Sequence, residues 1–217
     1  MTLSYGLVAP GATPGIDTTE LKPGLADPVH DSQRIFRALL QAMAHPGRPV
    51  AVGQGIEGPL PLDPATAAAA LTLADYDTPV WIDWIADTPQ VRSYLKFHCG
   101  CPIVERSQEA AFAVVSDPEN MPRLALFAQG IDQYPDRSAT LLLQVPDLEQ
   151  GPGVTLSGPG IPKNKPGDAA RIAPAGLPDW FWNDWRLNAA QYPLGVDIFF
   201  SCGETVIGLP RSILAEG

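Results

Sequence analysis

Two aspartates separated by one residue are the first candidates for a chemical role. They lie in the segment Asp75-Tyr76-Asp77-Thr78. Residues two apart in an extended chain point to the same side. The two carboxylates could therefore hold a metal ion or act as an acid–base pair. The competing interpretation is a helix end followed by a turn, where Asp and Thr side chains hydrogen-bond the local backbone.

An Asp-x-Asp pair also begins the nucleophile motif of haloacid-dehalogenase-like phosphatases. That motif requires an apolar strand before the pair and a threonine two residues after the second aspartate. Here an alanine-rich segment with helical character precedes the pair, and Pro79 stands where the threonine is needed. The sequence therefore disfavours this phosphatase chemistry.

A possible zinc site is formed by His98-Cys99-Gly100-Cys101, with Cys202 far along the chain. The Cys-x-Cys spacing is less typical of zinc than Cys-x₂-Cys, and no second ligand pair is visible. We therefore predict no metal. For His98 two interpretations stay open: it packs on the helix face that it shares with Val91 and Leu95, or it is a polar tip that binds an anion.

Capping residues followed by prolines predict where the helices that position these side chains begin. Asp27-Pro28, Asp63-Pro64, Thr88-Pro89 and Asp117-Pro118 each place a capping side chain before a proline, which is typical of a helix start. We predict helices over residues 28–44, 64–74, 89–98 and 118–128, and a later helix bearing Trp180, Trp182 and Trp185 that serves as core or subunit interface. In the first helix Ile35, Leu39 and Met43, with Phe36 and Leu40 beside them, are expected to form one apolar stripe.

Strands are predicted over residues 79–83, 111–116, 139–145 and 154–157, followed by a hairpin over 196–209 that turns at Cys202-Gly203. A Pro/Gly-rich arm over residues 1–26 precedes a single α/β domain over residues 27–217. We expect that domain to have three αβα layers around a mixed sheet.

Charge and composition exclude several classes of partner. The formal net charge of −10 argues against nucleic acid, because phosphate binding needs a basic face. The longest small-apolar stretch, residues 65–74, is too short to span a membrane, so no membrane partner is expected. No Gly-x-Ser-x-Gly, Walker or dinucleotide motif is present, and the start of the chain lacks a secretory pattern. With three cysteines and no disulfide framework, a cytoplasmic protein is expected.

Seven short segments, each weak alone, form an ordered set along the chain. They are Asp31–Gly47, Leu71–Val80, Leu95–His98, Ser138–Leu141, Leu156–Ile161, Pro193–Asp197 and Leu209–Arg211. In sequence and order this set resembles the PhnH subunit family of the bacterial carbon–phosphorus lyase system. The arm of about 26 residues and the cysteines Cys99 and Cys101 depart from the family pattern.

The resemblance implies a role in phosphonate use. Members of that family work with PhnG-, PhnI-, PhnJ- and PhnL-like proteins, in a step that displaces adenine from ATP and yields a ribose 1-alkylphosphonate 5-triphosphate. It also implies a homodimer for the isolated chain, and a fold like the large domain of pyridoxal-phosphate-dependent transferases without that cofactor. Family membership does not make this subunit the catalyst.

Two hypotheses follow for function. The first, which we favour, is a subunit of the phosphonate-activating complex that carries no catalytic motif of its own. The second is a stand-alone enzyme or a nucleotide- or phosphonate-binding protein with its own cleft. It requires that six polar side chains converge on that cleft; they are Arg37, Asp75, Asp77, His98, Asp197 and Arg211.

Overall fold

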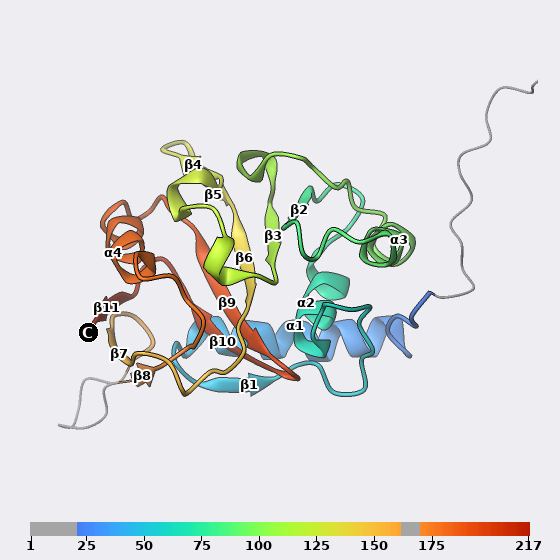
Figure 1. Ribbon diagram of the computed structural model, residues 1–217, viewed down its shortest axis with the longest axis horizontal. Coiled ribbons are helices and arrows are strands. Elements are labelled where there is room, and N and C mark those ends of the chain that lie inside the picture. Colours follow the sequence, from blue (N-terminus) through green and yellow to red (C-terminus); the bar gives the residue numbers. More distant parts are fainter. Residues whose placement is uncertain (1–20, 162–169) are drawn as a thin grey trace, which may run out of the picture.

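A six-stranded mixed sheet forms the centre of the computed structural model, which describes residues 21–161 and 170–217 (Figure 1). Its strand order is β1-β10-β9-β6-β3-β2. Four neighbouring strands, β2, β3, β6 and β9, run parallel to one another. The strand β10 pairs antiparallel with β9, and β1 pairs antiparallel with β10. The bounds are β1 Pro49–Ala51, β2 Val80–Ile82, β3 Phe112–Val115, β6 Thr140–Gln144, β9 Asp197–Cys202 and β10 Thr205–Leu209.

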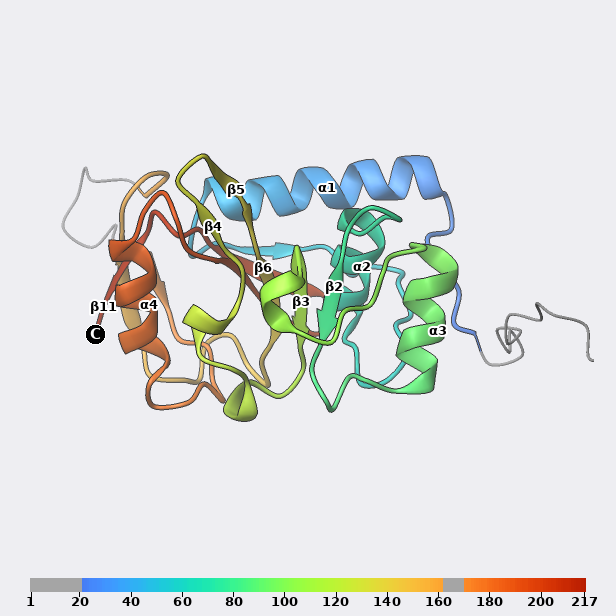
Figure 2. The same cartoon turned by 90° about the horizontal axis from the view of Figure 1, so that it is seen from above.

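Helices cover both faces of this sheet. On one face α1 (Pro28–Ala44), α2 (Pro64–Leu73) and α3 (Pro89–His98) enclose one apolar core. On the other face α4 (Phe181–Ala190) and a three-stranded sheet of β7 (Val154–Ser157), β8 (Ala170–Ile172) and β11 (Leu214–Glu216) enclose a second. Figure 2 shows α3 and α4 at opposite ends of the molecule. The predicted α/β domain with a mixed sheet is confirmed.

Side-chain capping marks where α1 and α3 begin, whereas the cap predicted at Asp63 before α2 does not form. The Asp27 carboxylate accepts hydrogen bonds from the backbone N–H groups of Val29 (3.1 Å) and His30 (3.0 Å), and Pro28 follows at the first helical position. Thr88 caps α3 in the same way through Val91 N–H. Both helices have the predicted bounds.

The helix predicted over residues 118–128 is wrong. Two short 3₁₀ turns, Pro118–Asn120 and Leu124–Leu126, occupy this segment, and Pro122 separates them. Met121 is extended (φ −66°, ψ 152°), as the residue before a proline usually is, because the proline ring clashes with a helical predecessor. The chain then forms a small hairpin of β4 (Gln129–Ile131) and β5 (Tyr134–Ser138).

The tryptophan-bearing helix is largely core. Trp185 is fully buried, and its indole N–H donates to the carbonyl of Ile213 at 3.0 Å. Trp180 lies at the N-cap rather than inside the helix, and with Trp182 it packs on the same core. No helix among residues 21–161 and 170–217 is long and apolar enough to cross a membrane.

The predicted arm over residues 1–26 falls mostly outside the described residues. Its last residues, from Leu21 onward, lie against α3, where Leu21 packs on the first core and Pro23 accepts a hydrogen bond from the Tyr94 hydroxyl (3.3 Å).

Candidate functional site

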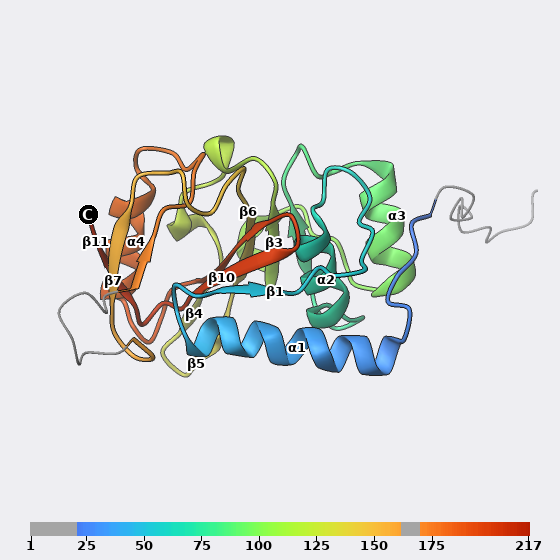
Figure 3. The ribbon, with the colours of Figure 1, turned by 90° about the horizontal axis from the view of Figure 1, so that it is seen from below.

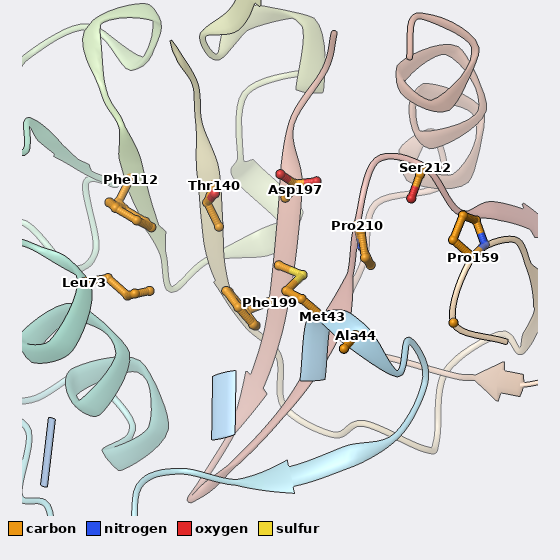
Figure 4. Close-up of a pocket in the computed structure, with 11 residues that line it drawn as sticks. Met43, Ala44, Leu73, Phe112, Thr140, Pro159, Asp197, Phe199, Pro210 and Ser212 are labelled. Atoms are coloured by element: carbon orange, nitrogen blue, oxygen red, sulfur yellow. The ribbon is translucent and has the colours of Figure 1, made fainter. Parts of the chain in front are cut away.

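A groove of about 420 Å³ opens at the amino ends of three neighbouring parallel strands (Figure 4). Phe112, Thr140 and Asp197 are the first residues of β3, β6 and β9, and they are paired in register across the sheet. Residues in register on neighbouring strands share a face, so the three side chains form one row. The remaining lining residues are Met43, Ala44, Leu73, Pro159, Gly160, Phe199, Pro210 and Ser212.

The turn Pro159-Gly160 closes one wall of the groove. Gly160 has φ +79°, and a Cβ placed there would lie 2.3 Å from the carbonyl oxygen of Ala44. Only glycine therefore allows this turn to approach the end of α1.

The opposite, carboxyl edge of these strands is closed by the chain itself, although ligands of open α/β sheets usually bind at that edge. Gln144 at the end of β6 accepts from Asp63 N–H (2.8 Å) and from the Thr66 hydroxyl (3.1 Å), and it donates to Pro61 O (2.9 Å). The Asp63 carboxylate in turn accepts from Gly203 N–H (2.9 Å). These bonds hold the start of α2 across the strand ends, so the groove lies at the amino ends instead.

Asp197 and Arg211 form the charged pair of the groove. The guanidinium Nε of Arg211 lies 3.1 Å from both carboxylate oxygens of Asp197, and its Nη2 donates to Oδ2 as well. Arg211 N–H also donates to Oδ1 (2.8 Å), and Nη1 donates to Pro135 O (3.0 Å) and Pro193 O (3.4 Å). Because the protein itself takes up these donors, the pair ties the loop after β10 to the start of β9.

Asp75 and Asp77 form a turn after α2. The Asp75 carboxylate accepts from Asp77 N–H (3.0 Å) and from the Thr78 hydroxyl (2.6 Å). This is the helix-end turn that the sequence offered as one interpretation.

His98 holds the chain that leads into α1. Its Nε2 lies 3.0 Å from the carbonyl oxygen of Lys22, and its ring packs edge-on against Tyr94 and Phe97. A Cβ on Gly24 would lie 2.6 Å from its Nδ1. These contacts support the packed interpretation of His98 over the anion-binding one.

Arg37 is exposed on α1 and does not line the groove. Across the described ranges 21–161 and 170–217, no group of three or more His, Cys, Asp or Glu side chains is arranged to hold a metal ion. Of the six polar side chains predicted to share a cleft, hydrogen bonds join Asp197 with Arg211 and Asp75 with the backbone of Asp77. Their ligand-binding role stays a prediction.

Helix α1 carries a second apolar stripe that the sequence analysis did not separate from the first. Val29, Phe36 and Leu40 are 73%, 46% and 51% exposed, whereas Ile35 and Leu39 are buried. At 3.6 residues per turn each residue is turned by about 100° from its predecessor, so one stripe cannot hold both sets. The exposed residues recur at i, i+7 and i+11, and Met43 at i+14 lines the groove. We call Val29, Phe36, Leu40 and Met43 the outer stripe of α1, the helix that Figure 3 shows alongside β1 and β10.

Comparison with known proteins assigns the chain to a family. A family model described as "Bacterial phosphonate metabolism protein (PhnH)" matches residues 23–216. The chain belongs to the PhnH family. It is 38% identical over 191 residues to "Alpha-D-ribose 1-methylphosphonate 5-triphosphate synthase subunit PhnH" of Rhizobium meliloti (strain 1021), covering 88% of this chain and 93% of that protein. It is 31% identical over 185 residues to "Putative C-P lyase subunit protein HtxG" of Stutzerimonas stutzeri, covering 83% of each.

The segments that carry the PhnH resemblance meet at the groove. Six of the seven contribute lining residues, which are Met43, Ala44, Leu73, Thr140, Pro159, Gly160, Asp197 and Pro210. The seventh, Leu95–His98, lies on α3 against residues 21–24. The family resemblance is confirmed, and its segments are brought together by the fold into one surface that also includes the end of the outer stripe.

Proposed function

We propose that this protein is a subunit of an alpha-D-ribose 1-alkylphosphonate 5-triphosphate synthase in the carbon–phosphorus lyase system. Its role there is to bind other subunits rather than to supply the reacting groups. The names of the two relatives support the assignment to such an assembly. The chemistry of the groove supports the role.

The groove is suited to apolar side chains and poorly suited to a polyanion. Its eleven lining residues include one charged side chain, Asp197, and no Lys, Arg or His. A triphosphate or a phosphonate would need cationic donors there, and the neighbouring Arg211 is already bonded to Asp197. The apolar lining therefore carries the proposal that the groove is an interface.

The outer stripe of α1 extends this interface and indicates the partner. Spacings of seven and four residues between exposed apolar side chains are those by which one helix packs along another. The partner that we infer is a PhnG-, PhnI- or PhnJ-like subunit that presents an amphipathic helix to α1 and an apolar side chain to the groove. The homodimer of the isolated chain, and the likeness of the fold to pyridoxal-phosphate-dependent transferases without that cofactor, stay predictions.

Co-purification tests this proposal. The tagged chain is co-expressed with PhnG-, PhnI- and PhnJ-like proteins. Wild type is expected to retain at least one of them. The double variant Phe36→Glu/Leu40→Glu should lose at least about nine-tenths of the bound partner, because a carboxylate would be buried in an apolar contact.

Leu187→Glu is the matched control, since Leu187 is 65% exposed on α4, at the other face of the sheet. It should retain the partner. Failure of wild type to recover any partner would overturn the subunit assignment. Equal recovery by the double variant and wild type would overturn only the proposed interface on α1 and would leave the subunit assignment standing.

The second hypothesis, a stand-alone nucleotide- or phosphonate-binding protein, gains no specific support from the contacts described above. Isothermal titration with ATP and with methylphosphonate tests it on the isolated chain. Saturable binding that is lost in Arg37→Ala or His98→Ala would favour it over the proposal. Absence of binding up to millimolar ligand is the result that we expect.

A further inference from the structure

The exposed side of α1 carries positive charge beside the outer stripe. Figure 2 shows this helix along one border of the molecule. Arg34 and Arg37 are exposed on it, and we call them the basic ridge. At about 100° per residue, Arg37 is turned by about 60° from Leu40 and Arg34 by about 120° in the same direction. Leu39, which is buried, is turned the opposite way, so the ridge follows the side of the outer stripe that faces away from the core.

No carboxylate shares this side of the helix. Asp31 is the one acidic side chain within α1. It lies nine residues before Leu40, so it is turned from it by about half a turn. Its side chain is 24% exposed and accepts from Arg34 at 3.3 Å. The ion pairs formed among residues 21–161 and 170–217 include none with Arg37.

This local positive charge contrasts with the chain as a whole, whose formal net charge is −10. A partner that carries carboxylates is repelled by an acidic chain in general and attracted only where cations gather. The ridge therefore favours docking of such a partner on α1. A second copy of this chain would present the same two arginines and no exposed carboxylate of α1, so it does not complement the ridge.

We propose that the partner helix on α1 carries Asp or Glu side chains along the border of its apolar face that meets the basic ridge. This inference rests on the proposed subunit role and specifies the partner that binds there. Charged residues beside an apolar seam set the partner choice and the orientation of paired helices. Because the ridge follows one side of the outer stripe only, a helix with carboxylates on one border fits in one direction and not in the reverse.

The two parts of this surface have different roles. The outer stripe supplies the apolar area that is buried on binding. The basic ridge stays at the rim, where exposed ion pairs add little to affinity but raise the rate of association and select among partners. Neutralising the ridge should therefore slow association, whereas placing a charge on the stripe should abolish retention.

Carbodiimide cross-linking tests the inference directly. Arg37→Lys keeps the positive charge and supplies an amine, which the reagent joins to a neighbouring carboxylate as an amide with loss of water. The full-length variant is mixed with a complex of PhnG-, PhnI- and PhnJ-like proteins purified without this chain. Peptide mapping should find position 37 linked to an Asp or Glu of one partner. Arg186→Lys, at an exposed position of α4, is the control and should give no such link.

Association rates give the second measurement. Arg34→Gln/Arg37→Gln should bind the same complex about threefold to tenfold more slowly than wild type at low salt. The difference should vanish at about 0.5 M NaCl, where charges are screened within a few Å; equal rates there also show that the variant is folded. Arg106→Gln/Arg186→Gln removes the same net charge from exposed positions outside α1 and should stay within about twofold of wild type at low salt.

Three results would overturn the inference. They are binding of Arg37→Lys without a link to a partner carboxylate, equal slowing by the two arginine double variants, and wild-type association that does not slow as salt rises. In each case, partner retention that is lost in Phe36→Glu/Leu40→Glu would still support the interface on α1. Absence of any binding by wild type would overturn the proposed subunit role and this inference together.

Discussion

Two arginine–carboxylate pairs show how single residues tie distant parts of this chain together. Arg123 donates to the buried carboxylate of Asp184 on α4, with Nε at 2.7 Å, and Leu124 N–H donates to the same group (3.3 Å). Arg211 holds Asp197 at the groove in the same bidentate manner. Each pair joins a loop to a helix or strand. Breaking either pair should therefore lower the stability of the fold.

The Asp184 pair predicts a pH-dependent contribution to stability. The hydrogen bond from Arg123 lowers the pKa of Asp184 below its ordinary value. The stabilisation is therefore complete above the ordinary carboxyl pKa of about 3.9 and is lost as pH falls through the lower, folded-state pKa. Asp184→Asn should reduce the free energy of unfolding by about 1–2 kcal/mol at neutral pH.

Urea denaturation at pH 7 and at pH 3 measures this difference, which should shrink at the lower pH. Asp87→Asn is the control, because the Asp87 carboxylate is more exposed than that of Asp184 and its pair with Arg92 should contribute under about 1 kcal/mol. A difference between wild type and Asp184→Asn that grows toward acid would contradict the assignment.

The Asp197 pair predicts strong coupling between its two members. Arg211→Gln should cost about 2 kcal/mol, because it leaves the partly buried carboxylate of Asp197 without its partner. Asp197→Asn combined with Arg211→Gln should cost less than the sum of the single changes. Urea denaturation of wild type, the two single variants and the double variant measures this coupling energy. If the losses in free energy of unfolding simply add, the two side chains do not stabilise the fold as a pair.

At the scale of elements, α2 shows how small side chains set the spacing between layers. Ala65, Ala67 and Ala68 are fully buried, and α2 lies between α1 and the strands β6 and β9. Larger side chains would push these layers apart. The buried alanines therefore allow α2 to pack closely on its neighbours.

Overpacking α2 should therefore be destabilising. Ala68→Leu adds three carbon atoms to a filled layer and should cost about 1–3 kcal/mol. Ala190→Leu, at an exposed position near the end of α4, is the control and should change stability by less than about 0.5 kcal/mol. Melting temperatures of the two variants check the expectation; a neutral Ala68→Leu would mean that the layer has unfilled space.

At the scale of the whole molecule, one sheet serves two cores. Neighbouring residues of β6 point in opposite directions, with Leu142 in the core beneath α1–α3 and Leu143 in the core beneath α4. Because every central strand contributes to both cores, neither core can form without the sheet. The two faces should therefore unfold together.

Cooperative unfolding follows from this shared sheet. Leu142→Ala and Leu143→Ala should each cost about 2–5 kcal/mol, since both side chains are buried. Tryptophan fluorescence, which reports on the face with Trp185, and far-ultraviolet circular dichroism should give coincident urea transitions for wild type and both variants. Separate midpoints for the two probes would show that one face unfolds before the other.

The elements that could be predicted from the sequence are those whose signals are local. Asp27-Pro28 and Thr88-Pro89 located two helix starts because capping acts within one turn of chain. The ordered segments identified the family, because they record residue types in series and do not depend on how the chain folds. Pro122 was also a local signal, and it outweighed the helix start predicted at Asp117-Pro118.

Which faces are covered and which side chains meet depends on the folded chain and could not be predicted from the sequence. Ile35 and Phe36 are both apolar, but the packing of α1 against β10 and α2 buries Ile35 and leaves Phe36 exposed. Asp197 and Arg211 meet because β9 and β10 form a hairpin, which brings the end of β10 back beside the start of β9. Burial and pairing of this kind depend on contacts across many residues, whereas propensity and capping reach only a few residues along the chain.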